Sequence, residues 1–209
     1  MSRRRKPVAG VPGAMVVIIS GPSGVGKDTI IRLLMKRHPH DDRHFVVTYK
    51  TREPRPTEVD GIDYQFVDID DFRRLLRRGE LLEATQVYGD WSGTPRDQVI
   101  AAISAGRDAL LRIDVQGSDK IKALIPEAIR IFVAPPSNDA RIERLANRAT
   151  ESAEQQARRR LVDEADMARA ADFDYVVINE TDQPEATADQ IDSIICQEHE
   201  RHPDRQINL

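Results

Sequence analysis

The chain has 209 residues, a length that suits one domain with small inserted lobes. Hydrophobic residues make up 40% and charged residues 32%, with a net charge of −4, so the sequence supports a core but lacks the basic surface of a nucleic-acid-binding protein. No apolar run approaches the roughly 20 residues of a membrane-spanning helix. We therefore expect a cytoplasmic protein with neither a nucleic-acid nor a membrane partner.

The first elements of the chain are a strand, a loop and a helix in immediate succession. Residues 1–14 contain a short basic run but no long apolar stretch, so we predict a disordered N-terminal tail. Residues 15–20, MVVIIS, are a β-branched apolar run that predicts a buried parallel strand. Residues 29–38 carry apolar side chains at helical spacing, and the stretch GPSGVGKD lies between strand and helix.

The stretch from residue 21 to residue 28 has the composition of a phosphate-binding loop. Its glycines allow backbone N–H groups to turn toward an anion, and the helix N-terminus adds partial positive charge. The lysine that follows reaches terminal phosphates. An ordinary Gly-Pro turn does not need this set of glycines followed by lysine. We therefore predict a nucleotide-binding loop formed by Gly21, Pro22, Ser23, Gly24, Val25, Gly26, Lys27, Asp28 and Thr29.

Asp28 departs from the Ser or Thr that usually follows the lysine of such a loop. The usual hydroxyl is a neutral oxygen ligand of Mg²⁺. A carboxylate is also a hard oxygen ligand, but it adds negative charge beside a polyphosphate. Thr29 does not replace the hydroxyl, because one residue along a helix turns it by about 100°. Two interpretations stay open: Asp28 binds Mg²⁺, or it only caps the helix.

Residues 48–93 differ in character from the strands and helices around them. Their first part is polar and rich in proline and glycine, and a short alternating strand is expected at Ile62, Tyr64 and Phe66. A helix and another strand follow within residues 70–89. We predict that residues 48–93 form an inserted lobe standing off the main sheet.

The lobe carries side chains suited to a phosphorylated acceptor. Arg52 and Arg55 flank Pro54, and a proline-stiffened turn can aim both guanidinium groups at one anion. A carboxylate nearby can accept from the ring N–H and the amino group that guanine offers as an adjacent pair. Together with Tyr64 this describes a nucleoside monophosphate site, whereas each residue taken alone fits a solvated charged loop.

The rest of the chain alternates strands with helices. Apolar runs predict strands at residues 108–114, 128–135 and 173–179. Helical patterns occur at Pro95–Ile103, Asp139–Asn147 and Glu154–Arg169. This alternation indicates an α/β fold with an open parallel sheet covered on both faces. We expect the core at residues 15–47 and 94–198 and a C-terminal tail at residues 199–209.

Taken together, these motifs resemble the guanylate kinase family. The similarity runs from Val16 to about Glu198 and rests on GPSGVGKD, TREPRPTEVDGIDYQFV, ELLEATQVYGDWSGTP, RIDVQG, FVAPPS, RLANRATES and FDYVVIN. The resemblance implies a three-layer P-loop core with a GMP-binding lobe and a short lid at about residues 148–156. It also implies transfer of the γ-phosphate of ATP to GMP with Mg²⁺. Whether dGMP is also accepted, and whether the protein is a monomer or a homodimer, is left open.

The resemblance implies a role for each matching residue. The GMP phosphate would be held by Arg52, Arg55 and Tyr64, with Ser92 close by. Guanine would be read by Glu83 and Asp114, assisted by Thr48 and Thr94, with Glu58 in support. The lid-side arginines of the family are matched by Arg144, which would contact ATP, Arg148 and Arg159. The predicted catalytic residues are Lys27, Arg52, Arg148 and Arg159.

Five positions besides Asp28 depart from the common pattern of that family, and members with the same Gly-Lys-Asp ending and a basic residue before the second aspartate form a subgroup that this chain resembles. Thr48 stands where a serine is usual, which keeps the hydroxyl. Tyr49 and Lys50 replace small hydroxyl residues, and Lys50 either contacts a phosphate or faces water. Ser92 stands where many members have a tyrosine that touches the phosphate. Arg112 replaces an aspartate, which changes the local charge by two units.

Two other functions are weighed against this one. A kinase for a ribose bisphosphate would share the loop and its Asp ending but would lack the base-reading set, so Glu83 and Asp114 speak against it. A catalytically silent, protein-binding module of the same type characteristically loses the loop glycines and lysine. Because this chain keeps both, transfer to GMP is the favoured prediction.

Overall fold

The computed structural model describes residues 10–37, 42–87, 89–137 and 153–209, without the side chains of residues 153–160. The strands are β1 (Val16–Ser20), β2 (Arg43–Val46), β3 (Tyr49–Lys50), β4 (Gln65–Phe66), β5 (Leu81–Val87), β6 (Asp90–Pro95), β7 (Asp108–Arg112), β8 (Ile129–Ala134) and β9 (Tyr175–Ile178). The helices are α1 (Lys27–Arg37), α2 (Ile69–Arg78), α3 (Arg96–Ser104), α4 (Val115–Leu124), α6 (Ala153–Ala168), the short 3-10 helix η1 (Ala170–Asp172) and α7 (Pro184–Arg201).

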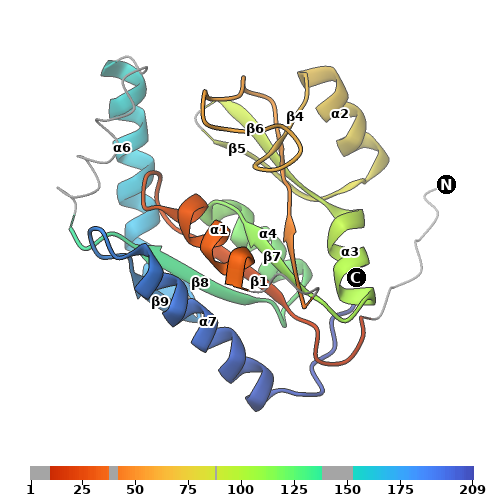
Figure 1. Cartoon of the computed structure of the whole chain (residues 1–209). Coiled ribbons are helices and arrows are strands. Elements are labelled where there is room, and N and C mark those ends of the chain that lie inside the picture. Colours follow the sequence, from red (N-terminus) through yellow and green to blue (C-terminus); the bar gives the residue numbers. More distant parts are fainter. Residues whose placement is uncertain (1–9, 38–41, 88, 138–152) are drawn as a thin grey trace.

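A five-stranded parallel sheet in the order β2-β7-β1-β8-β9 forms the centre of the molecule. Helices cover both of its faces, so the predicted α/β class is confirmed (Figure 1). β1 is the middle strand, and all of its residues are buried. Because the carboxyl ends of parallel strands share one edge of a sheet, the loop after β1 opens at the same edge as the segment after β7.

The side chains of β1 point alternately into two hydrophobic clusters, one on each face of the sheet. Val17 and Ile19 pack in a cluster with residues of α1 and α7. Val16 and Ile18 pack in a cluster with residues of α3 and α4. Burial on both faces explains the continuous apolar run in the sequence, and it gives the loop that follows β1 a rigid anchor.

A second, four-stranded sheet in the order β4-β3-β6-β5 stands above one side of the core (Figure 1). β5 and β6 form an antiparallel hairpin, and helix α2 packs on this sheet through the buried ring of Phe72. The ring of Phe72 lies 5.8 Å from that of Trp91 on β6. Strands β3, β4 and β5, helix α2 and most of β6 fall within residues 48–93.

Most predicted elements of the core are confirmed. The strands expected at residues 15–20, 108–114, 128–135 and 173–179 are β1, β7, β8 and β9. The strand expected to begin at Ile62 is shorter, because the amides of Ile62 and Asp63 both donate to the carbonyl of Val59 and close a turn. The sequence analysis did not identify β2, α4 or α7. The helix predicted at Asp139–Asn147 lies outside the described residues.

The two ends of the chain pack against each other instead of forming free tails. The amide of Gly10 donates to the carbonyl of Ile207 at 2.9 Å, and the amide of Val11 donates to the carbonyl of Ile103 at 2.9 Å. Ile207 is fully buried in the cluster beneath α3. The predicted disorder is therefore wrong for residues 10–14, whereas residues 1–9 lie outside the described part. The predicted C-terminal tail likewise begins within α7 and ends on the core.

Among the helices of the described residues, none combines the length and the apolar character that crossing a bilayer requires.

We predict that Ile207→Ala lowers the free energy of unfolding by about 2–4 kcal/mol, because it empties a filled position in the core. Asn208→Ala is the matched control, since its side chain is exposed and its loss should change stability by less than about 0.5 kcal/mol. Urea denaturation followed by circular dichroism measures both. Equal stability of the two variants would show that the C-terminal segment does not pack on the core.

Candidate active site

The loop between β1 and α1 has the backbone conformation that its glycines permit. Gly21, Gly24 and Gly26 have φ values of 139°, 79° and 98°, which L side chains rarely adopt. A Cβ on Gly21 would lie 2.2 Å from the carbonyl oxygen of Val133 on β8. A Cβ on Gly26 would lie 2.6 Å from the side-chain nitrogen of Asn179. Both positions therefore require glycine, and the loop is held tightly against β8 and the residue that follows β9.

Lys27 begins helix α1 and folds back over the loop. Its ammonium group donates to the carbonyls of Gly21 at 2.7 Å and Pro22 at 2.8 Å. Burial lowers the pKa of Lys27 to about 8, although the neighbouring carboxylates of Asp28, Asp163 and Asp166 raise it. The ammonium group is thus held at the mouth of the loop by two carbonyl groups, and the three nearby carboxylates offset only part of its desolvation.

Asp28 is the second residue of α1, one position inside the helix, and it does not occupy the N-cap position. Its carboxylate lies 2.6 Å from a guanidinium nitrogen of Arg112, the last residue of β7. Arg112 is buried, with 4% of its side chain exposed, and it also donates to the backbone carbonyl of Asp63. Its guanidinium group lies 3.9 Å from the centre of the Tyr64 ring. Arg112 therefore joins the phosphate loop to the acceptor lobe.

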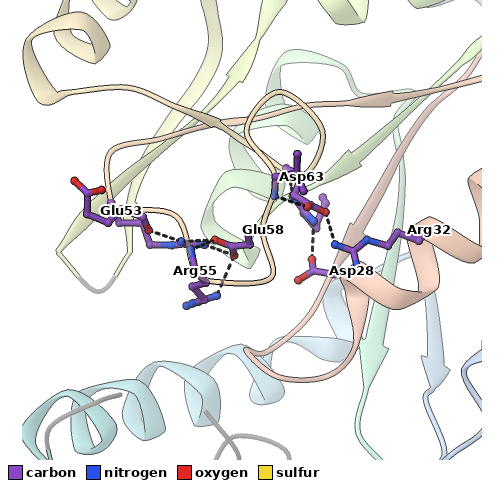
Figure 2. Close-up of polar contacts among 9 residues, drawn as sticks. Asp28, Arg32, Glu53, Arg55, Glu58 and Asp63 are labelled. Carbon is purple, nitrogen blue, oxygen red and sulfur yellow. Dashed lines mark hydrogen bonds and ion pairs between the residues drawn. The ribbon is translucent and has the colours of Figure 1, made fainter. Parts of the chain in front are cut away.

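Glu58 organises the two arginines of the lobe (Figure 2). Its carboxylate accepts two hydrogen bonds from Arg52, at 2.7 and 2.6 Å, and one from the Arg55 amide at 2.8 Å. Burial raises the pKa of Glu58, but the hydrogen bonds from Arg52 and the Arg55 amide outweigh it, so the pKa is lowered overall. Glu58 stays ionised and holds the guanidinium group of Arg52 in one orientation.

Asp63 joins the same loop of the lobe to helix α1 (Figure 2). One carboxylate oxygen lies 2.6 Å from the guanidinium group of Arg32, and the other accepts from the Val59 amide at 2.9 Å. Arg32 and Asp63 were not identified from the sequence. Nothing in the local residue pattern indicates that these two side chains meet.

A second group of predicted residues lies deeper, around Glu83 on β5. The carboxylate of Glu83 accepts from the hydroxyls of Thr94 at 2.8 Å and Thr85 at 2.9 Å, and burial raises its pKa. Asp114 caps α4 by accepting from the Gly117 amide at 2.9 Å. A Cβ on Gly117 would lie 3.2 Å from Glu83 and 3.6 Å from Asp114, so both carboxylates flank this glycine.

Thr48 completes that deeper group. It is buried, and its hydroxyl has no hydrogen-bond partner among the residues that the structure describes. A buried hydroxyl without a partner carries a desolvation cost, which a bound polar ligand removes.

A cavity of about 600 Å³ connects the phosphate loop to the acceptor lobe. Its lining includes most of the predicted residues: Gly21, Ser23, Gly24, Val25, Gly26, Lys27, Asp28, Thr29, Arg52, Arg55, Glu58, Tyr64, Ser92 and Asp114. Pro22, Thr48, Glu83 and Thr94 do not line it. A larger depression of about 950 Å³ lies near the end of α7 and is lined by none of the predicted residues.

Helix α6 contributes two carboxylates that the sequence analysis did not single out. Asp163 accepts from the Ser23 amide of the phosphate loop at 2.9 Å. Burial raises the pKa of Asp166 to about 6, with the Asp114 and Asp163 carboxylates adding to the shift, and Asp166 lines the cavity. Only the fold brings α6 to the loop, because some 140 residues of chain separate Ser23 from Asp163.

None of the contacts described above involves the predicted lid-side arginines. Arg144, Arg148 and most of the predicted lid at residues 148–156 lie outside the described residues. Arg159 belongs to α6, but its side chain is not described.

The sequence model of the guanylate kinase family matches residues 13–198. The chain is 38% identical to guanylate kinase 2, chloroplastic/mitochondrial, of Oryza sativa subsp. japonica, over 98% of this chain and 71% of the relative. It is 44% identical to the guanylate kinase of Mycobacterium bovis, over 83% of this chain and 85% of the relative.

A solved structure is also similar in fold. The crystal structure of guanylate kinase from Anaplasma phagocytophilum superposes with a TM-score of 0.71 at 30% sequence identity. The similarity covers 90% of this chain and 88% of that one.

We predict that the Asp28–Arg112 pair contributes a coupling free energy of about 1–2 kcal/mol to folding, because Arg112 is buried and Asp28 is its carboxylate partner. The measurement is a double-mutant cycle of Asp28→Ala and Arg112→Met in urea denaturation. The exposed pair Asp70–Arg73 on α2, mutated in the same way, should show about 0.5 kcal/mol or less. Additive effects of Asp28→Ala and Arg112→Met would refute the coupling.

Proposed function

The chain belongs to the guanylate kinase family and is an ATP:GMP phosphotransferase, and we propose that its reaction takes place in the cavity between the phosphate loop and the lobe. The observation that carries this proposal is the lining of one continuous cavity by both sets of residues. Phosphoryl transfer requires the donor and acceptor phosphates to lie in line within one enclosure. The reaction yields ADP and GDP.

At the donor end, the loop of residues 21–26 and the N-terminus of α1 would hold the β- and γ-phosphates of ATP. The ammonium group of Lys27 now donates to two loop carbonyls, at 2.7 and 2.8 Å. The phosphates of ATP are stronger acceptors, and they would take over these hydrogen bonds. Their charge would also restore the pKa of Lys27 toward its ordinary value, so the lysine would be fully charged in the complex.

At the acceptor end, Arg52, Arg55 and Tyr64 would hold the phosphate of GMP. Glu58 uses two donors of Arg52, and a guanidinium group has five, so donors remain for a phosphate oxygen. The two arginines and Glu58 together carry a net charge of +1, which favours an anion.

At the base end, Glu83 and Asp114 would accept from the ring N–H and the amino group of guanine. A carboxylate has about four acceptor sites, so Glu83 can accept from guanine in addition to Thr85 and Thr94. The unpartnered hydroxyl of Thr48 would donate to a guanine acceptor. A ligand with no such base would leave the buried hydroxyl of Thr48 without a partner, which supports GMP as the acceptor.

The chemistry needs little from the protein beyond positioning and charge neutralisation. The GMP phosphate oxygen is already ionised at neutral pH, so transfer needs no general base. We assign Lys27, Arg52, Arg148 and Arg159 the task of neutralising charge on the transferring group. Closure of the lobe and lid would exclude water and prevent hydrolysis of ATP.

The residues at the loop also fit a Mg²⁺ ion that enters with ATP. Mg²⁺ commonly binds one or two carboxylates together with substrate phosphates and water. The carboxylate of Asp28 lines the cavity and is 39% exposed, and the guanidinium group of Arg112 neutralises it. Asp28 thus presents oxygen without added net charge, as the usual hydroxyl does. When bound, the ion would neutralise negative charge on the phosphates.

Three further predictions come from the sequence alone. They are a monomeric or homodimeric state, acceptance of dGMP and a cytoplasmic location. The ribose-bisphosphate kinase and the silent binding module gain no support from the cavity, because Asp114 of the proposed base-reading pair and the loop lysine Lys27 both line it.

We predict that GMP is the preferred acceptor when GMP, AMP, UMP and ribose phosphates are offered side by side with ATP. A coupled assay of ADP release measures each rate. AMP and UMP should be slower by a factor of about 10⁴ or more, because neither base offers Glu83 and Asp114 the adjacent ring N–H and amino group of guanine. Turnover with a ribose phosphate but not with GMP would refute the proposed function.

We predict that Asp28→Ala raises the Mg²⁺ concentration needed for half-maximal rate by about tenfold or more, because it removes an oxygen ligand. Asp28→Ser is the matched control, since its hydroxyl restores a neutral ligand and part of the Mg²⁺ affinity. Titration of the initial rate with Mg²⁺ at fixed ATP measures both. An unchanged Mg²⁺ requirement in Asp28→Ala would leave Asp28 only its ion pair with Arg112.

A further inference from the structure

The ammonium group of Lys50 lies in the acceptor cavity without a hydrogen-bond or ion-pair partner among the described residues. Lys50 is on β3, is partly buried and lines the cavity. Its nitrogen lies 5.4 Å from the centre of the Tyr64 ring. A desolvated cation beside an aromatic ring, with no acceptor for its three N–H groups, is costly unless a ligand provides one.

The other cations that line the described part of this cavity are already engaged. Lys27 donates to two loop carbonyls, and Arg32 pairs with Asp63. Arg52 and Arg55 share Glu58, and Arg112 pairs with Asp28. Lys50 differs from all of them, because among the described residues it has neither an acceptor nor an ion-pair partner, so all of its donors are available to an incoming anion.

The position of Lys50 on strand β3 indicates the direction in which its side chain extends. Thr48, Lys50 and Arg52 alternate along the chain, so they face the same side, and Lys50 lies between the base end and the phosphate end. Its partner in register on β6 is Ser92, a short side chain that also lines the cavity. A short neighbour leaves the lysine room, and its contact with Tyr64 shows that it extends toward the phosphate end.

We propose that Lys50 binds the phosphate of the acceptor nucleotide as an additional ligand beside Arg52, Arg55 and Tyr64. This inference rests on the proposed function, since it assumes that GMP occupies the cavity. The ammonium group then donates a charge-assisted hydrogen bond to a phosphate oxygen. Lys50 is thereby a determinant of GMP affinity and of its pH dependence.

The pH dependence follows from the surroundings of Lys50. Burial lowers its pKa to about 8, the carboxylates of Asp114 and Glu83 raise it, and the guanidinium groups of Arg52 and Arg112 lower it further. A bound phosphate dianion raises this pKa, because it favours the charged ammonium. The contribution of Lys50 to GMP affinity is therefore complete below pH 8. It is lost as the pH rises above about 8 toward the higher pKa of the complex.

The test compares the wild-type protein with Lys50→Met and Lys50→Arg. Isothermal titration calorimetry gives the Kd for GMP and for guanosine, which lacks the phosphate, and steady-state assays give KM for GMP and ATP. Lys50→Met should weaken GMP binding by about 10- to 100-fold and leave guanosine binding and the KM for ATP nearly unchanged. Lys36→Met is the matched control, because it removes an exposed lysine on α1 outside the cavity lining.

Titration between pH 7 and pH 9.5 gives a second, independent readout. Wild-type affinity for GMP should fall with pH more steeply than that of Lys50→Arg, whose guanidinium group stays charged throughout. Lys27 is the same in both proteins, so its own titration cancels in the comparison. This comparison remains informative even if Lys50→Met folds poorly.

Each outcome decides the inference. Unchanged GMP affinity in Lys50→Met, equal losses for GMP and guanosine, or identical pH profiles for wild type and Lys50→Arg would each overturn it. Failure of the wild-type protein to phosphorylate GMP would instead refute the proposed function. The two failures are therefore distinguishable.

Discussion

The buried guanidinium group of Arg112 is the point where the donor and acceptor sides of the cavity meet. It pairs with Asp28 in the first turn of α1, donates to the backbone of Asp63 and stacks on Tyr64. A buried guanidinium group without its partners would be strongly destabilising, so these contacts must form together. The orientation of the lobe relative to the phosphate loop is thus set by one side chain at the end of β7, assisted by the Arg32–Asp63 pair.

The electrostatics of the cavity follow the same pattern of prearranged pairs. Each arginine that lines it in the described part of the chain is held by a carboxylate, which fixes its direction before any ligand arrives. Fixed cations act on a phosphate without the reorganisation that water would require. Lys50 and Lys27 have no ion-pair partner among the described residues, and burial lowers the pKa of both to about 8. Anionic substrates would therefore stabilise the charged form of both lysines as they bind.

The sequence predicted the parts of the fold that depend on local pattern, and failed where distant segments meet. The pattern of a strand buried on both faces followed by glycines and a lysine lies within one short stretch of the chain. The sequence therefore predicted β1, the loop and α1. Arg32 and Asp63, or Ser23 and Asp163, come together only when the sheet order is known. The sequence did not predict the burial of Ile207, because a single apolar residue among polar neighbours shows no periodicity.

Asp28 shows how a site residue can be recognised from sequence while its chemistry depends on the fold. Beside a polyphosphate, a carboxylate in place of a hydroxyl adds a repulsive charge, and this made the substitution look unfavourable. Arg112 stands where the family usually has an aspartate, which is a change in the opposite sense, and the two side chains lie 2.6 Å apart. The two departures offset each other only in part: Asp28 adds one negative charge, whereas Arg112 in place of an aspartate removes two. The pair is therefore neutral where a hydroxyl and an aspartate together carry one negative charge. Each substitution alone is expected to cost stability, so they are best understood as a single change.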